Sequence, residues 1–358
     1  MPEETSSSHP FPCHGYAVHS ASEPLAPFDF ERRALGPHDV LIAIEYCGVC
    51  HSDIHQAHND WGNARYPMVP GHEIIGTVKA IGELVSRHPV GSRVGVGCMV
   101  NSCRACANCL AREEQFCLKH TVMTYNDVEA DMKTPTYGGY SDCIAVNEDF
   151  VLRIPESLDP ASAAPLLCAG ITTYSPLRHW KIGPGHKLAI AGFGGLGHIG
   201  VKIAHSMGIE VTVLSTSPEK EEDARTMGAQ HFVNTNDPLA LPTLHDSFDV
   251  IVNTMPVNYS LDLYLNALKA NGVLISVGMP TQFFSLHPFS LQMKRRSLCG
   301  SFMGGIAETQ EMLDYCGTHN IAASVELIKP DEINQAWENV SAKKARYRYV
   351  IDFTKDSQ

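Results

Sequence analysis

The chain has 358 residues, of which 44% are hydrophobic and 18% are charged, and its formal net charge is −12. This is the composition of a folded protein that is long enough for two domains. The net negative charge, with short basic clusters at residues 294–296 and 343–348, argues against a nucleic-acid partner, since neutralising a phosphate backbone requires many clustered Lys and Arg side chains.

The hydropathy pattern indicates a protein that is not embedded in a membrane. No uninterrupted apolar run reaches the roughly 18 residues of a spanning helix. The first dozen residues lack the basic and apolar regions of a secretory signal, so we expect a cytoplasmic location. Four of the 12 cysteines fall within residues 103–117, which in a reducing compartment favours metal binding over disulfides.

The predicted elements change in kind along the chain. Residues up to about 160 contain short runs rich in β-branched residues, at 40–45 and 73–81, that are punctuated by Gly and Pro. Beyond Pro160 the order becomes strand, Gly-rich turn, helix and strand, in units of about 30 residues, which is typical of a helix-covered parallel sheet. After Phe302 we expect a helix near residues 308–315 and a final strand at 347–353 that returns to the first domain.

The cysteine-rich segment reads Cys103-x2-Cys106-x2-Cys109-x7-Cys117. Four thiolates in one short lobe match a closed tetrahedral zinc site, which has no open position for catalysis. Four apolar core cysteines are the alternative, but polar loop residues such as Arg104 surround them. The segment predicts a structural zinc.

A second metal site is suggested by three scattered residues, Cys50, His72 and Cys168. Together they offer three ligands and leave a fourth position for water or a substrate oxygen, as a catalytic zinc requires. Two alternatives remain open at this point: His72 as a structural histidine, and Cys47 with Cys50 as a redox pair.

A dinucleotide site is predicted between a strand at residues 187–191 and a helix at 195–207. The turn between them carries the G-x-G-x-x-G pattern, formed by Gly192, Phe193, Gly194, Gly195, Leu196 and Gly197. These glycines permit the tight turn, the close approach of the pyrophosphate and the packing of the helix, whose N-terminus faces the phosphates.

The end of the next strand, at residues 210–214, predicts which dinucleotide binds. An NAD enzyme would place a carboxylate there for the ribose hydroxyl. This chain instead has Ser215, Thr216 and Ser217, followed by Pro218 and Lys220. Hydroxyls, a cation and a helix start favour the 2′-phosphate of NADP(H). The alternative is that Ser217 only caps a helix and Lys220 is a surface charge.

These motifs resemble a known family. Gly71-His72-Glu73-x2-Gly76-x5-Gly82-x2-Val85, the four-cysteine lobe and the glycine turn occur in the order found in zinc-containing alcohol dehydrogenases of the medium-chain dehydrogenase/reductase superfamily. Within that family the chain is most similar to cinnamyl alcohol dehydrogenases and their bacterial relatives, through the segments 48–53, 66–73, 138–141 and 167–170.

The resemblance implies a fold and an assembly. The fold is an α/β protein with a GroES-like β-rich catalytic domain at residues 1–167, including a zinc lobe at about 98–120. A Rossmann-type doubly wound parallel sheet follows at 168–304, and 305–358 return to the catalytic domain. Homodimers form through an edge strand, here near residues 297–303.

The resemblance also implies roles for individual residues. Two zinc ions bind per chain, one catalytic and one structural, and Ser52, His55 and Asp60 relay a proton. Asp53 orients His72, Glu73 lies behind the catalytic metal, Arg348 meets the cofactor pyrophosphate, and Trp61 and Met123 line the substrate pocket. The metal ligands are Cys50, His72 and Cys168 at the catalytic zinc and Cys103, Cys106, Cys109 and Cys117 at the structural zinc, and Ser215, Thr216, Ser217 and Lys220 face the NADP phosphate.

The expected activity is the interconversion of primary alcohols and aldehydes with NADP(H). Met123 stands where plant members carry an aromatic residue, so we expect broad use of aromatic, cinnamyl-type and medium-chain aldehydes. Two alternatives are a zinc-independent quinone or enoyl reductase of the same superfamily and a non-catalytic NADPH- or zinc-binding protein.

Overall fold

The computed structural model describes residues 9–257 and 259–354, so most of the first dozen residues, on which the absence of a secretory signal was judged, lie outside them. The chain divides into two compact units. Unit 1 comprises Met1–Cys168 and Gly304–Gln358, and unit 2 comprises Ala169–Met303. The boundaries expected from the sequence, 167/168 and 304/305, each differ from these by one residue. Among the described residues, no helix combines the length and apolar character needed to cross a membrane.

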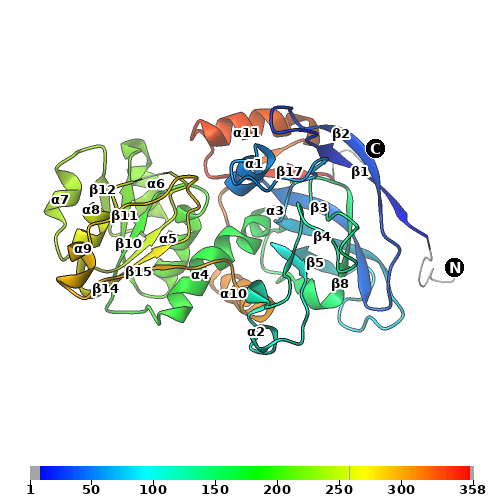
Figure 1. The fold of residues 1–358 in the computed structure, drawn as a ribbon, viewed down its shortest axis with the longest axis horizontal. Coiled ribbons are helices and arrows are strands. Elements are labelled where there is room, and N and C mark those ends of the chain that lie inside the picture. The colour runs from blue at the N-terminus through cyan, green and yellow to red at the C-terminus, as the bar shows by residue number, and fades with distance from the viewer. Residues whose placement is uncertain (1–8, 258, 355–358) are drawn as a thin grey trace. The chain divides into compact units, whose positions relative to one another are not determined.

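Unit 1 is rich in strands, as its short β-branched runs predict (Figure 1). Its strands are β1 (Phe11–Ala17), β2 (Ala26–Arg32), β3 (Asp39–Gly48), β4 (Ile74–Ile81), β5 (Arg93–Val96), β6 (Met99–Asn101), β7 (Val122–Met123), β8 (Cys143–Asn147), β9 (Leu152–Arg153), β16 (Val325–Ile328) and β17 (Arg348–Asp352). Its α-helices are α1 (His51–Ala57), α2 (Ala107–Leu110), α3 (Pro160–Ala163), α10 (Ile306–His319) and α11 (Ile333–Ser341). Its 3-10 turns are η1 (Glu114–Phe116), η2 (Glu148–Phe150), η3 (Ala164–Leu167) and η5 (Pro330–Glu332).

The main sheet of unit 1 runs β16-β17-β3-β4-β5-β9, with β8 also paired to β3. The long strand β3 is central because its residues from Asp39 to Ile44 are almost all buried, and Gly76 of β4 crosses it so closely that a Cβ would lie 2.0 Å from Ala43 O. Strand β17 pairs antiparallel with β3, placing Val350 opposite Gly48. The C-terminal segment therefore completes the first unit, beside the start of the Cys50 segment.

Unit 2 is a six-stranded sheet in the order β12-β11-β10-β13-β14-β15, and every neighbouring pair is parallel. Its strands are β10 (Lys187–Ala191), β11 (Glu210–Ser215), β12 (His231–Asn234), β13 (Phe248–Asn253), β14 (Leu268–Ser276) and β15 (Ser297–Gly300). Its helical segments are α4 (Ala169–His179), α5 (Gly197–Ser206), η4 (Pro218–Lys220), α6 (Glu221–Thr226), α7 (Ala240–Thr243), α8 (Leu261–Ala267) and α9 (Phe289–Gln292).

Helices pack on both faces of this sheet, as in a doubly wound fold (Figure 1). Leu261 and Leu265 of α8 join a buried cluster with Ala189 of β10. The next residue of β10, Ile190, points to the opposite face and lies against Gly200 of α5. The α/β class and the parallel sheet predicted from the sequence are therefore confirmed.

Several elements differ from the sequence-based expectations. Helix α5 begins at Gly197 and not at Gly195, because the glycine turn continues through Leu196. Strand β15 is limited to Ser297–Gly300, shorter than the edge strand expected over 297–303. Strand β16 and helix α11 were not expected from the sequence. Trp337 of α11 is buried and donates from Nε1 to Tyr140 Oη at 3.3 Å.

Candidate functional site

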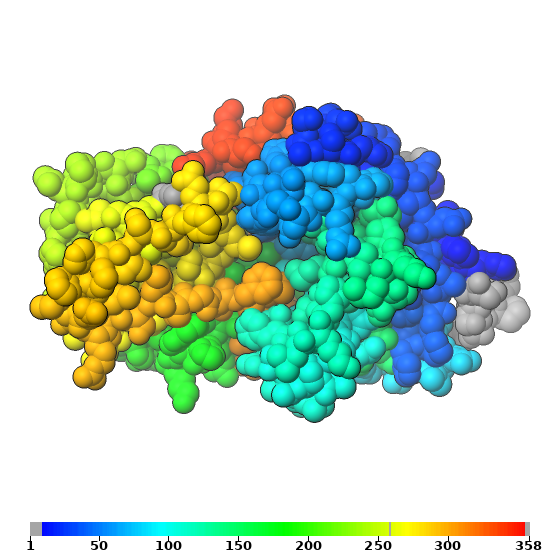
Figure 2. Space-filling model, viewed as in Figure 1, coloured from blue at the N-terminus to red at the C-terminus, as the bar shows by residue number. Residues whose placement is uncertain are grey.

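The four-cysteine segment forms a small surface lobe of unit 1, from β6 through α2 to η1 (cyan-green in Figure 2). The Sγ atoms of Cys103, Cys106, Cys109 and Cys117 all lie within 4.8 Å of one another. Individual separations are 3.5 Å from Cys106 to Cys109 and 4.0 Å from Cys106 to Cys117. Four thiolates around a tetrahedral zinc at 2.3 Å are about 3.8 Å apart, so this arrangement fits zinc closely.

Backbone donors around the lobe stabilise negative charge on its sulfurs. The amide of Cys103 donates to Cys117 Sγ at 3.4 Å, and that of Cys106 donates to Cys103 Sγ at 3.3 Å. Hydrogen bonds from the backbone at Cys109 and Leu118 lower the pKa of Cys106 to about 6. Metal binding requires thiolates, so these amides prepare the lobe for a cation.

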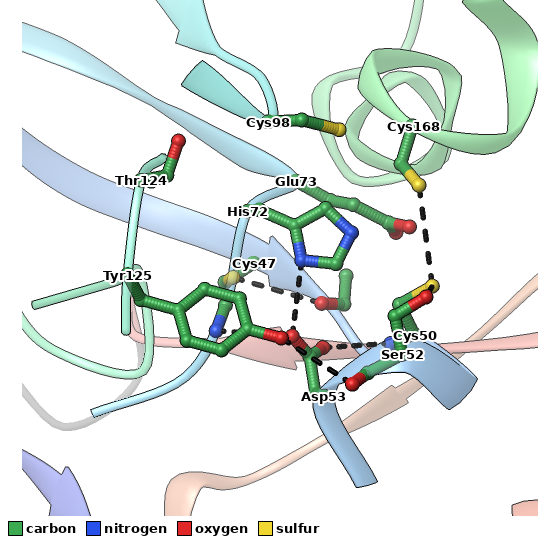
Figure 3. A network of polar contacts seen from close by, with 12 residues as sticks. Cys47, Cys50, Ser52, Asp53, His72, Glu73, Cys98, Thr124, Tyr125 and Cys168 are labelled. Carbon is green, nitrogen blue, oxygen red and sulfur yellow. Dashed lines mark hydrogen bonds and ion pairs between the residues drawn. The ribbon is translucent and has the colours of Figure 1, made fainter. Parts of the chain in front are cut away.

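A second ligand cluster is buried inside unit 1 and consists of Cys50, His72, Glu73 and Cys168, whose ligand atoms lie within 4.8 Å of one another (Figure 3). Cys50 follows β3 and precedes α1, while His72 and Glu73 lie just before β4. Cys168 follows η3. The separation between the sulfurs of Cys50 and Cys168 is 4.0 Å, which again suits a shared metal. The cluster thus unites the three ligands predicted from distant parts of the sequence.

Asp53 holds this cluster in place and is fully buried. Its carboxylate accepts hydrogen bonds from Cys50 N at 3.0 Å and Gly71 N at 3.3 Å, and from Tyr140 Oη at 3.1 Å. Oδ1 lies 3.0 Å from His72 Nδ1, so the other ring nitrogen of His72 faces the sulfurs (Figure 3). This is the arrangement by which a carboxylate orients a metal-binding histidine.

Glu73 and Arg348 form a buried ion pair behind the cluster. The guanidinium of Arg348 binds Glu73 Oε1, and both side chains are at most 4% exposed. Glu73 Oε2 has no hydrogen-bond partner within the described residues. An unpartnered buried carboxylate oxygen among two thiols and an imidazole is a donor available to a cation. Arg348 is thus the ion-pair partner of Glu73, and its predicted contact with a cofactor pyrophosphate stays a prediction.

The residues predicted to relay a proton are divided between two positions. Ser52 Oγ lies 3.6 Å from Cys50 Sγ, at the edge of the cluster. His55 Nδ1 lies 2.6 Å from Asp60 Oδ2, and its ring is 5.6 Å from that of Trp61. His55 Nε2 is buried and has no hydrogen-bond partner among the residues described. Ser52 and His55 both belong to α1, which brings them within one turn of each other.

The close-up also shows residues that sequence reasoning missed. The ring of Tyr125 stacks on that of His72 with centroids 5.8 Å apart, and its hydroxyl donates to Ser52 O at 3.4 Å. The thiol of Cys98 lies beside Cys168 and donates to Leu167 O at 3.8 Å (Figure 3). Cys98 was overlooked because it lies outside the cysteine lobe and any local motif. Met123 directly precedes the Thr124-Tyr125 pair, and its pocket role stays a prediction.

In unit 2 the glycine turn has the conformation that its sequence requires. Gly192 has φ +94°, a value that favours glycine, and a Cβ on Gly197 would lie 2.0 Å from Gly192 O. The Nζ of Lys220, which is 6% exposed, donates to Phe193 O at 3.4 Å. Lys220 is thus a buried cation beside the turn, and its alternative as an exposed surface charge is wrong.

The hydroxyl residues at the end of β11 do not form the helix cap by Ser217 that was considered as an alternative. Ser217 occupies the N-cap position of η4, but its side chain accepts no capping hydrogen bond. Instead the buried Ser215 accepts at Oγ from Ser217 N at 3.1 Å. The Thr216 carbonyl accepts from Asn236 Nδ2 at 2.5 Å. A capping role for the Ser217 side chain is therefore not the reason for these hydroxyls.

Comparison with known proteins agrees with this architecture. Residues 36–156 match the alcohol dehydrogenase GroES-like domain, and residues 195–317 match the zinc-binding dehydrogenase family. The chain is 53% identical to NADP-dependent alcohol dehydrogenase C 1 of Mycolicibacterium smegmatis, over 94% of this chain and 97% of that one. It is 48% identical to the aldehyde reductase YahK of Escherichia coli, over 94% and 96%.

A solved structure with a similar fold is a cinnamyl alcohol dehydrogenase of Sorghum bicolor, with a TM-score of 0.93 and 39% identity. The match covers 95% of this chain and 97% of that chain. The resemblance inferred from the zinc and glycine motifs is confirmed across both units. The chain belongs to the zinc-containing alcohol dehydrogenases of the medium-chain dehydrogenase/reductase superfamily.

Proposed function

We propose that this protein is a zinc-dependent oxidoreductase that interconverts primary alcohols and aldehydes with NADP(H). This proposal is carried by the buried cluster of Cys50, His72 and Cys168, with the Ser52 hydroxyl at its edge. Behind the cluster lies a Glu73 oxygen that has no hydrogen-bond partner among the described residues. A purely structural metal site has no need of a neighbouring hydroxyl or an open position. The names of the relatives, an NADP-dependent alcohol dehydrogenase and an aldehyde reductase, support the same reaction and cofactor.

Each residue of the cluster has a distinct task in this proposal. Cys50, His72 and Cys168 hold a zinc ion, which when bound supplies Lewis-acid polarisation of a carbonyl oxygen. Asp53 fixes the tautomer and direction of His72. The four cysteines of the surface lobe hold a second zinc that stabilises the lobe.

Proton movement is assigned to Ser52 and His55. The Ser52 hydroxyl both donates and accepts hydrogen bonds, so it passes a proton between the reacting oxygen and a second group. His55, held by Asp60 through Nδ1, takes up or gives that proton at Nε2, which has no hydrogen-bond partner among the described residues. Asp60 keeps the imidazole in one orientation. The contacts of Ser52 and of His55 support these roles separately, and a substrate or cofactor hydroxyl must connect the two side chains.

The cofactor proposal rests on unit 2. The glycine turn, with the N-terminus of α5 behind it, suits a pyrophosphate. Ser215, Thr216, Ser217 and the buried cation of Lys220 suit a 2′-phosphate, since the end of β11 carries hydroxyl residues where an NAD enzyme places a carboxylate for the ribose hydroxyl. We assign this turn to NADP(H) with Lys220 as the charged partner.

The substrates are proposed to be aromatic, cinnamyl-type and medium-chain aldehydes, near Trp61 and the flexible Met123. The test is NADPH consumption by the zinc-loaded protein with benzaldehyde, cinnamaldehyde and hexanal, with NADH as the matched control cofactor. Turnover of all three with NADPH is the expected result. Reduction of quinones or enones but of no aldehyde would favour the zinc-independent reductase alternative, and binding without turnover would favour a non-catalytic protein.

We also propose a homodimer formed through β15, which is the edge strand of its sheet. Its outer backbone groups are available for strand addition, and the preceding segment exposes Phe283, Phe289 and Met293. That segment lies on the visible surface (yellow-orange in Figure 2). Sedimentation of the zinc-loaded protein tests this, with Leu298→Pro as the variant expected to shift it to monomer. The cytoplasmic location also stays a prediction.

A further inference from the structure

Cys13 of β1 and Cys143 of β8 lie opposite each other where these two strands meet. An antiparallel bridge joins Gly15 to Ser141. Counting two residues from this bridge, backward along β1 and forward along the partner segment, leads to Cys13 and Cys143. Two cysteines that are 130 residues apart in the sequence thus become direct cross-strand neighbours.

The backbone hydrogen bonds show which kind of cross-strand pair this is. Tyr16 N donates to Tyr140 O at 2.8 Å, and Asp142 N donates to His14 O at 2.9 Å. These bonds flank the bridge, so the bridged residues form a non-hydrogen-bonded pair. The regular pairing ends one residue further on, because His14 N donates to Asp142 Oδ1 and Asp142 O accepts from Ile44 N. The closeness of Cys13 and Cys143 is therefore read from their sulfur atoms.

The two sulfurs occupy the same space between the strands. Both Sγ atoms and a carboxylate oxygen of Asp142 lie within 4.8 Å of one another. Cys13 Sγ is 3.4 Å from Cys143 O, and Cys143 Sγ is 3.8 Å from Pro12 O, so each sulfur reaches across to the other strand. Cys13 is only 1% exposed and Cys143 is partly exposed, so solvent reaches this pair at Cys143.

The surroundings of Cys13 lower the pKa of its thiol. The hydrogen bond from the Cys143 thiol and the nearby Arg32 guanidinium lower this pKa, and together they outweigh burial and the Asp142 carboxylate, which raise it. Arg32 is buried and donates from Nε to Cys143 O at 3.0 Å. Two thiols and one carboxylate offer three ligand groups to a metal, whereas the catalytic and structural clusters of this chain bring four each. Asp142 is already bonded to His14 N and the Cys13 thiol.

We propose that Cys13 and Cys143 are a peroxide-reactive dithiol that closes into a cross-strand disulfide, tying the β1-β2 hairpin to β8. The Cys13 thiolate attacks hydrogen peroxide, breaking its O–O bond to give a sulfenic acid and hydroxide, which takes a proton to become water. Cys143 then attacks the Cys13 sulfur, expelling hydroxide, and its thiol proton converts that hydroxide to water. Two thiols and one peroxide give one disulfide and two waters. The site is independent of the zinc and nucleotide sites.

The test uses the zinc-loaded wild-type protein, treated with hydrogen peroxide and then alkylated, digested with trypsin and analysed by mass spectrometry without reduction. Trypsin releases residues 1–32 with Cys13 as the only cysteine and residues 134–153 with Cys143 as the only one, so their covalent link is diagnostic. We expect this linked peptide in the wild type and in the matched control Cys299→Ser. It should be absent in Cys143→Ser and lost from the wild type after dithiothreitol.

Two results would overturn the proposal. The first is that the wild-type protein gives no linked peptide at a peroxide dose that already oxidises Cys299, a partly exposed cysteine on β15. This result does not depend on any variant folding. The second is a third zinc ion per chain that protects both thiols from alkylation until a chelator removes it, which would identify a metal site. Asp142→Asn separates the two ideas, since it should speed disulfide formation but weaken a metal.

Discussion

Replacing Asp53 with Asn tests how the catalytic cluster is held. The carboxylate of Asp53 serves four donors, with Cys50 N and Tyr140 Oη on Oδ2, and Gly71 N and His72 Nδ1 on Oδ1. An amide of the same shape has only one acceptor oxygen. If that oxygen stays with His72 and Gly71, the amide NH2 faces a backbone N–H and a phenol.

The phenol of Tyr140 can turn to accept from the new amide, but the N–H of Cys50 cannot. One buried donor is therefore left without an acceptor, at a cost of about 1–3 kcal/mol. The negative charge that supports His72 is lost as well. Removal of such a supporting carboxylate weakens metal binding by about 10–100-fold, which corresponds to about 1.4–2.8 kcal/mol. The free-energy cost of the unpaired N–H and that of the weakened metal binding are therefore similar in size.

The assay is zinc affinity, measured by competition with a chromophoric chelator, for the wild type, Asp53→Asn and Tyr140→Phe. The phenylalanine variant removes one donor and leaves the carboxylate, so its affinity should change by less than about tenfold. Zinc in the four-cysteine lobe serves as an internal reference, because no contact of Asp53 reaches it. If Asp53→Asn loses the catalytic zinc no more readily than the wild type, the orienting role of Asp53 is wrong.

Two further predictions concern unit 2. Lys220→Gln should weaken the binding of NADPH about 10–100-fold and that of NADH little, since a hydrogen bond between charged groups contributes about 1.5–3 kcal/mol. Titration of nicotinamide fluorescence measures both affinities, and an equal loss for the two cofactors would contradict this prediction. Burial lowers the pKa of His198 to about 3, so between about pH 6.5 and pH 3 the unfolded chain binds one more proton than the folded chain, and the free energy of unfolding decreases as the pH is lowered through that window. Between pH 7.5 and 5.5 the free energy of unfolding in urea should fall by about 1.4 kcal/mol less in His198→Gln than in the wild type. An equal fall in both proteins would show that His198 is not the group responsible.

The fold and much of the site could be predicted because their signals are local. Strand β10 has the bounds expected from its apolar run, and the Cys103 lobe is a compact motif. The sequence suggested Cys50, His72 and Cys168 as ligands of one metal but left alternatives open until the family resemblance was considered, because their closeness arises only when β3, β4 and η3 pack together. Cys98 had no local signal, and its place beside Cys168 is a product of that packing.

Other features depend on pairing across the fold. The partner of Arg348 is Glu73, 275 residues away, because β17 pairs with β3. A C-terminal strand was foreseeable from its apolar residues, but its register was not. The closeness of Cys13 and Cys143 likewise depends on the bridge between Gly15 and Ser141, which no local sequence pattern predicts.

The central claim is that the buried cluster of unit 1 holds a zinc that the reaction requires. Its most direct test is zinc content by mass spectrometry together with NADPH-dependent reduction of benzaldehyde, for the wild type and Cys50→Ser. The account predicts two zinc ions per chain and turnover for the wild type, and one zinc ion with no turnover for the variant, whose lobe zinc remains. A variant that keeps one zinc ion and full aldehyde reduction would contradict it.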